Sequence, residues 1–137
     1  MDKCMRIILF LLLVFLSNSA LACRCGGLSD EEYFYQAEEV LLVQVLATEL
    51  IEGEKDSDSK VKVGFRVLET FKKSDTPSKF VYTGLSNCSP HIRAGYKYVF
   101  YIPNNKVVST CTGSYNILTH TRYGKEKLAK LREQEAI

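Results

Sequence analysis

Cysteines are the residues of this 137-residue chain whose type and spacing could do chemistry. Cys23 and Cys25 are separated by one residue, Cys88 and Cys111 follow far along the chain, and Cys4 lies near its start. Without Cys4, four cysteines allow three pairings. A Cys23–Cys25 bridge would close a very small ring with poor geometry. In the two other pairings both N-terminal cysteines are cross-linked to Cys88 and Cys111, and cysteine spacing leaves these two pairings open.

Residues 1–22 have the pattern of a secretory signal peptide. After a positively charged start, Ile7 to Leu16 form an unbroken apolar run of ten residues, and Ala20-Leu21-Ala22 is a small-x-small cleavage sequence. A run of this length is too short to span a bilayer as a helix. The alternatives are a buried core helix or a membrane anchor. Cleavage after Ala22 would remove Cys4 and leave an even number of cysteines, which predicts two disulfides in an exported chain.

The predicted cleavage makes Cys23 the first residue of the exported chain. Cross-links from Cys23 and Cys25 to distant cysteines would hold this terminus rigidly, with the Arg24 side chain beside it. A free α-amine titrates near pH 8. The amine and carbonyl oxygen of Cys23 could therefore form a five-membered chelate at the open position of a catalytic zinc in another protein. The alternative is that the cysteines only stabilise the fold.

A second alternative concerns lipid attachment at Cys23. A cysteine directly after a signal sequence is the attachment site of bacterial lipoproteins, which usually have a leucine followed by two small residues before it. Here Ala20-Leu21-Ala22-Cys23 places the large residue one position late. Plain cleavage fits this sequence better, and acylation would remove the amine that chelation needs.

The rest of the chain predicts a single mainly β domain over residues 23–137. Ser29 and Glu32 predict a capped helix that ends near Ala37. A second helix, with Leu128 and Leu131 on its inner side, is expected near the C-terminus. Alternation and turn residues predict strands over 40–46, 61–67, 79–83, 96–102 and 106–111, the last two as a hairpin. Five short strands with a helix at each end fit a small closed barrel.

The order of these motifs resembles the tissue inhibitors of metalloproteinases (TIMPs) and the wider netrin-like (NTR) domains. Cys23-Arg24-Cys25 matches the Cys-x-Cys signature at the mature N-terminus of this family. The similarity covers nearly the whole mature chain. Its further segments are 36–45, 67–72, 80–83 with Cys88, 96–100 with Cys111, and the helix near 125–132.

The resemblance implies an OB-fold barrel with disulfides Cys23–Cys88 and Cys25–Cys111. It also implies that the chain inhibits a zinc metalloprotease, with the amine and carbonyl of Cys23 on the protease zinc. The Arg24 side chain would enter the specificity pocket beside that zinc, and Ser86 and Asn87 would line the neighbouring cleft. Arg24 replaces the small Thr or Ser usual in the family, and a long cation suits an acidic pocket.

The protease-binding residues implied by the resemblance all lie at or beside the cysteines. They are Cys23, Arg24, Cys25, Ser86, Asn87 and Cys88. Many NTR domains share the barrel without inhibiting anything. The alternative function is therefore a non-inhibitory, exported protein-binding module, which could also be lipid-anchored.

Other functional classes receive little support from the sequence. The net charge of +2, or +1 after cleavage, argues against nucleic acid as a partner. His91 and His120 have no nucleophile or acidic partner at a recognisable spacing, so we expect no enzyme activity. The Cys88–His91 spacing suits zinc only if Cys88 stays unpaired. We expect no cofactor, no metal of the chain's own, a protein partner, and a secreted or periplasmic location.

Overall fold

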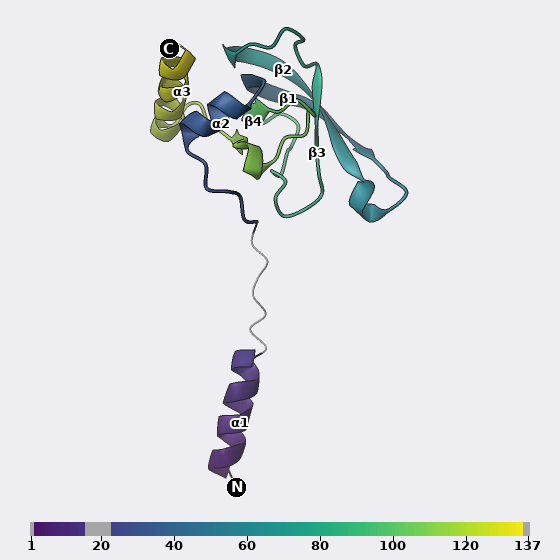
Figure 1. Ribbon diagram of the computed structural model, residues 1–137, viewed down its shortest axis with the longest axis vertical. Coiled ribbons are helices and arrows are strands. Elements are labelled where there is room, and N and C mark those ends of the chain that lie inside the picture. Colours follow the sequence, from purple (N-terminus) through teal and green to yellow (C-terminus); the bar gives the residue numbers. More distant parts are fainter. Residues whose placement is uncertain (1, 16–22, 136–137) are drawn as a thin grey trace.

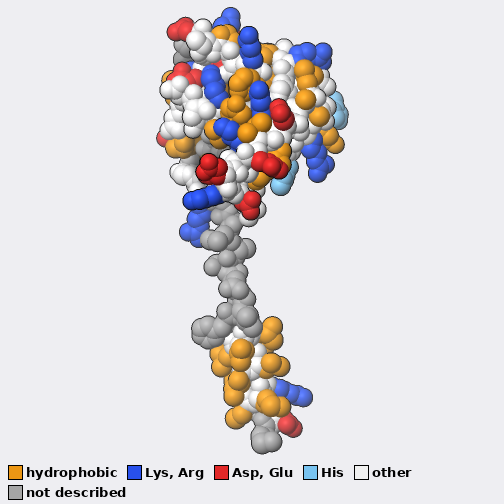
Figure 2. Space-filling model, turned by 90° about the vertical axis from the view of Figure 1, so that its right-hand side faces the viewer, with side chains coloured by type: hydrophobic (Ala, Val, Ile, Leu, Met, Phe, Trp, Pro, Cys, Tyr) orange, Lys and Arg blue, Asp and Glu red, His pale blue; other side chains and the backbone are white. Residues whose placement is uncertain are grey.

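The structure is a computed structural model that describes residues 2–15 and 23–135 (Figure 1). The predicted cleavage sequence Ala20-Leu21-Ala22 lies outside the described residues. Helix α1 spans Asp2–Phe15, and its side chains from residue 2 to 14 are exposed. Figure 2 shows hydrophobic side chains around this helix. Among the described helices, none has the length and apolar character needed to cross a membrane.

The domain is built on one open antiparallel sheet with the strand order β3-β2-β1-β4-β5. Its strands are β1 (Glu39–Ile51), β2 (Lys60–Lys72), β3 (Phe80–Thr83), β4 (Lys97–Ile102) and β5 (Tyr115–Asn116). The long β1–β2 hairpin carries a 3-10 turn, η1 (Asp56–Asp58), at its tip. The prediction of a mainly β domain with five strands and terminal helices is confirmed at this level.

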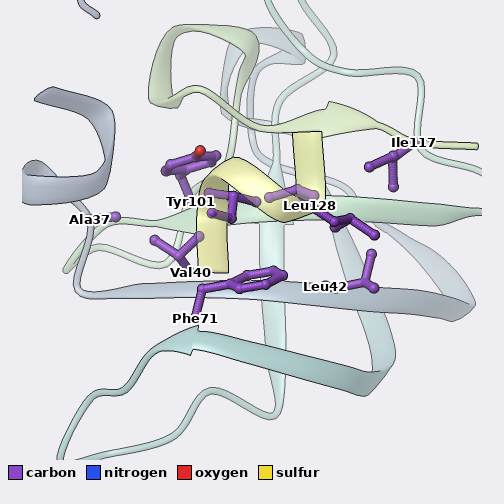
Figure 3. Close-up of a cluster of buried hydrophobic side chains, with 9 residues drawn as sticks. Ala37, Val40, Leu42, Phe71, Tyr101, Ile117 and Leu128 are labelled. Atoms are coloured by element: carbon purple, nitrogen blue, oxygen red, sulfur yellow. The ribbon is translucent and has the colours of Figure 1, made fainter. Parts of the chain in front are cut away.

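Both faces of the first half of the central strand β1, residues 39–45, are largely buried, as the nearly continuous apolar sequence there predicts, and the second half, from Leu46 on, is mostly exposed. One face packs in a cluster that includes Val43, Val63 and Phe100. The other face carries Val40 and Leu42 beneath the helices (Figure 3). The sheet therefore lies between two hydrophobic clusters.

Two helices cover the second cluster. Helix α2 (Asp30–Gln36) begins with the predicted capping box, because Ser29 Oγ accepts from Glu32 N at 3.2 Å and Glu32 Oε2 accepts from Ser29 N at 2.7 Å. Helix α3 (Arg122–Glu135) buries Leu128 and Leu131, as predicted. Gly124 lets this helix approach the preceding turn, because a Cβ there would lie 2.1 Å from the carbonyl oxygen of Leu118.

The predicted strand over 106–111 and its hairpin with 96–102 are wrong. After the turn at Pro103, Lys106 adopts φ 62° and the chain moves to β3. There Tyr82 N donates to Lys106 O and Val108 N donates to Tyr82 O, both at 2.8 Å, which makes one parallel bridge between Tyr82 and Val107. The free edge of β4 pairs instead with β5, which the sequence analysis missed.

Buried electrostatics explain this path of the chain. The side chain of Glu39 is 3% exposed, and its carboxylate accepts from the backbone N and the hydroxyl of Ser78. Lys106 Nζ donates to Ser78 Oγ at 2.7 Å and lies 3.6 Å from Glu39 Oε2. A buried carboxylate needs such partners, so Lys106 is drawn toward β3 rather than along β4.

Candidate functional site

Two adjacent disulfides form the candidate site. Cys23 is bonded to Cys88 with an S–S distance of 2.01 Å, and Cys25 is bonded to Cys111 with one of 2.02 Å. This is the pairing that the resemblance implies. The Sγ atom of Cys23 also lies 3.4 Å from that of Cys111 and 3.8 Å from that of Cys25. Residues 23–25, 86–88 and 110–111 thus meet in one place, which we call the cysteine ridge.

Hydrogen bonds join the two loops that receive the disulfides. The backbone N and the Oγ1 atom of Thr110 both donate to Cys88 O, at 2.9 and 2.8 Å. Thr110 and Cys111 belong to a short 3-10 turn, η2 (Thr110–Thr112), whose start is capped by Ser109. Thr110 was not predicted as part of the site, although it is the residue directly before Cys111. The cysteine ridge is therefore held by hydrogen bonds as well as by disulfides.

The segment after Cys25 is also held in place. Gly27, at φ 63°, turns the chain toward helix α2. Tyr33 of that helix packs on Gly113, where a Cβ would lie 2.8 Å from Tyr33 Cγ, and its ring meets Tyr101 edge-on at 6.2 Å between centroids. The N-terminal segment is thus held in place at the disulfides and, further along the chain, by the packing of Tyr33 in helix α2.

The exposed side chains of the cysteine ridge differ in chemistry. Arg24, Ser86 and Asn87 are exposed, and the three cysteines predicted for the site are half-buried. Within residues 2–15 and 23–135, the guanidinium of Arg24 forms no hydrogen bond or ion pair. Leu85, 59% exposed at the side of Ser86, adds an apolar group that the sequence analysis missed. The cysteine ridge therefore presents a cation, polar groups and one large apolar side chain.

The chemistry of the sulfur atoms rules out a metal site formed by these cysteines while the disulfides are intact. The sulfurs of Cys23, Cys88 and Cys111 lie within 4.8 Å of one another. Metal binding by cysteine requires a thiolate, and each of these sulfurs is in a disulfide. The Cys88–His91 spacing cannot make a zinc site for the same reason.

A cavity of about 370 Å³ lies between α2 and α3, away from the cysteine ridge. Tyr101 and Tyr115 line it, together with an ion pair between Lys127 and Asp30 at 3.5 Å. Burial, helped by the charge of Asp30, raises the pKa of Tyr101 to about 12 and the pKa of Tyr115 further. Both phenols therefore stay protonated at neutral pH.

Comparison of the sequence with models of known protein families and with curated proteins finds no match.

Proposed function

We propose that this chain is an exported inhibitor of a zinc metalloprotease, with a TIMP-like domain of the netrin type. The observation that carries the proposal is the position of Cys23. This residue is bonded to Cys88 and lies 3.4 Å, sulfur to sulfur, from the second disulfide. A terminus at Cys23 would be held in one orientation before any partner binds. Such preorganisation lowers the entropic cost of association.

The proposed inhibition depends on cleavage before Cys23. The new α-amine, with an ordinary pKa near 8, would lose its proton on metal binding. Amine nitrogen and carbonyl oxygen of Cys23 would then occupy the zinc position at which a catalytic water normally binds. The cysteine ridge has no role in chemistry of its own in this mechanism, because it acts by occupying the zinc of another protein.

The side chains around Cys23 would set the choice of protease. Arg24 is exposed and unpaired in the described part of the chain, so its charge is free to meet a carboxylate in the pocket beside the zinc. Ser86 and Asn87 would contact the neighbouring cleft. The proposed target is therefore a metalloprotease whose pocket next to the zinc is acidic, because an apolar pocket would impose a desolvation cost on the guanidinium.

We also propose that the sheet is the wall of an OB-type barrel. The parallel bridge between Tyr82 and Val107 supports this, because it links the edge strand β3 to the segment that follows β4. Val108 is fully buried in the cluster on the same side of the sheet as Val81. A closed wall would leave β3 without a free edge.

The experiment that tests the inhibitor is the addition of one alanine before Cys23. The variant and the natural terminus are compared against a panel of zinc metalloproteases, including members with acidic pockets. We expect the inhibition constant to rise by roughly 100-fold or more, about 2.7 kcal/mol, because the added peptide bond removes the free amine. One alanine added after Ile137 is the matched control. Equal inhibition by both variants would refute chelation.

A second candidate function is a binding module that uses the sheet rather than the terminus. It is favoured by the outer face of β2 and β3, where Lys62 Nζ lies 4.4 Å from the ring of Phe80 and Lys60 Nζ lies 4.1 Å from that of Tyr82. Figure 2 shows basic and hydrophobic side chains close together on one face of the domain. If the chain has this function, adding a residue before Cys23 should leave partner binding unchanged.

A further inference from the structure

A small cavity lies beside the cysteine ridge. Its volume is about 300 Å³, and it is bounded by the ends of β2 and β3 and by the loop that follows β3. Ser86 lines it and also belongs to the cysteine ridge. The volume is at the lower end of the range typical of small-molecule sites.

One residue that lines this cavity, Thr83, has a buried hydroxyl without a partner in the part of the chain that the structure describes. Thr83 is 3% exposed, and among the residues described its buried Oγ1 atom has no hydrogen-bond partner. In the pairing of β2 with β3, Thr83 lies opposite Val61, and both residues line the cavity. A buried hydroxyl without a partner is destabilising, so its retention needs an explanation. A bound acceptor would supply the missing hydrogen bond.

The other polar groups of the cavity favour an anion. The hydroxyl residues Ser86 and Ser89 line it, and so do His91 and Arg93. No acidic residue is among its lining residues, and the guanidinium of Arg93 has no carboxylate partner in the described part of the chain. Hydroxyl donors with an unpaired guanidinium are suited to a carboxylate.

The cavity walls are held in place without a ligand. Tyr98, buried in the core, accepts a hydrogen bond from Arg93 N at 2.9 Å and donates one to His91 O at 3.0 Å. On the other side Ser89 N donates to Ser86 O at 3.0 Å. Binding would therefore require little reordering of the backbone.

We propose that this cavity binds a small organic carboxylate that has a short apolar body. The carboxylate would accept from the serine hydroxyls, with Arg93 as the counter-ion, and from Thr83 Oγ1 once rotation of the Thr83 side chain turns its buried hydroxyl into the cavity. The apolar body would contact Val61 and Ile92, which line the same cavity. This site does not depend on the proposed inhibition, because it uses neither the α-amine of Cys23 nor Arg24.

The test is a titration followed by the backbone amide signals of Gly84 and Ser89 in NMR spectra of the exported chain. Butyrate is the probe, while 1-butanol lacks the charge, acetate lacks most of the apolar body, and sodium chloride controls for ionic strength. We expect butyrate to shift these amide signals saturably and acetate to bind at least about 10-fold more weakly. Butanol and sodium chloride should cause no saturable shift. Equal shifts with butanol, or no saturable shift with butyrate, would overturn the proposal.

Two variants test the groups that are proposed to bind the carboxylate. Thr83→Val keeps the shape of the side chain and removes the hydroxyl, and Arg93→Gln removes the charge. Each should raise the dissociation constant of butyrate by about 10-fold or more. Arg122→Gln, on the exposed surface of α3, is the matched control and should leave the constant unchanged. If both Thr83→Val and Arg93→Gln bind butyrate as well as the natural chain, these groups do not bind the carboxylate and the proposal is wrong. If Thr83→Val misfolds, Arg93→Gln still provides the test.

Discussion

The Sγ atom of Cys23 lies 3.4 Å from the Sγ atom of Cys111, although the two residues belong to different disulfides. Each disulfide thus limits the movement of the other. The hydrogen bonds from Thr110 to Cys88 O join the two loops on which the disulfides end. The N-terminal residues are consequently positioned by a small rigid unit rather than by a single cross-link.

The two disulfides should contribute similarly to stability and differently to inhibition. They span sequence separations of 65 and 86 residues, which corresponds to about 4 kcal/mol each by loop entropy. We expect urea unfolding of the Cys23→Ala/Cys88→Ala and Cys25→Ala/Cys111→Ala variants to show comparable losses. Inhibition should fall more in the first variant, because residue 23, the proposed zinc-binding terminus, is then no longer cross-linked. Greater loss of inhibition in the second variant would contradict this account.

Replacement of Arg24 should change protease inhibition while leaving the stability of the fold nearly unchanged. The side chain is exposed and unpaired in the described chain, so Arg24→Ala should change the free energy of unfolding by less than about 0.5 kcal/mol. Arg24→Glu should abolish inhibition of a protease with an acidic pocket, through repulsion between like charges. Lys73→Glu, also exposed, is the control for net charge and should inhibit normally. An Arg24→Glu variant that inhibits as well as the natural chain would contradict the proposed role.

The ion pair between the buried Glu39 and the partly exposed Lys106 should be important for stability. Lys106→Met would leave the carboxylate of Glu39, 3% exposed, with Ser78 as its remaining partner. We expect a loss of about 3 kcal/mol in the free energy of unfolding, measured by denaturant titration. The double variant Glu39→Gln/Lys106→Met should recover part of this loss, because it no longer buries an unpaired charge. A double variant that is less stable than Lys106→Met would argue against the buried charge as the cause.

The contact between α3 and β2 should weaken at acidic pH. Arg132 donates to both carboxylate oxygens of Glu69, at 2.7 and 2.8 Å, and this hydrogen bonding lowers the pKa of Glu69 below its ordinary value of 4.5. A lowered pKa means that the stabilisation is complete well above pH 4.5 and is lost as the pH falls through the lowered value. Because the pair is partly exposed, its contribution should be below about 1 kcal/mol.

Thermal unfolding of the natural chain and Arg132→Gln across this pH range tests the contact. The natural chain should be the more stable at neutral pH, and the two should converge in acid. Lys130→Gln, on an exposed residue of the same helix, controls for the loss of a positive charge. A constant difference between the natural chain and Arg132→Gln at all pH values would show that Glu69 is not the titrating partner.

Local signals predicted much of the fold. The Ser29–Glu32 capping box and the apolar run of β1 are determined by residues close in sequence, and the structure forms both. The prediction of a strand over 106–111 was wrong because groups far away in the sequence decide what this segment pairs with. Lys106 reaches Glu39 and Ser78, and Val107 bridges Tyr82, which no local pattern indicates. Strand β5, Tyr115–Asn116, is too short to show an alternation.

The candidate site was predictable in part. Cysteine number and spacing indicated that Cys23 and Cys25 reach distant partners, and the resemblance supplied the pairing that the structure forms. Sequence gave no sign that the hydroxyl of Thr83 lacks a partner, because that depends on the loop that follows β3. Nor did it indicate that Thr110 joins the two disulfide loops, since this hydrogen bond spans residues 88 and 110.

The intact mass of the exported chain, with and without reduction and alkylation, tests the central claim most directly. The account predicts the mass of residues 23–137 less four hydrogens, two for each disulfide, and hence a free amine on a cross-linked Cys23. Reduction should then allow four cysteines to be alkylated. A mass increased by a lipid, or a chain that begins at another residue, would contradict the account, because the chelating amine of Cys23 would not exist.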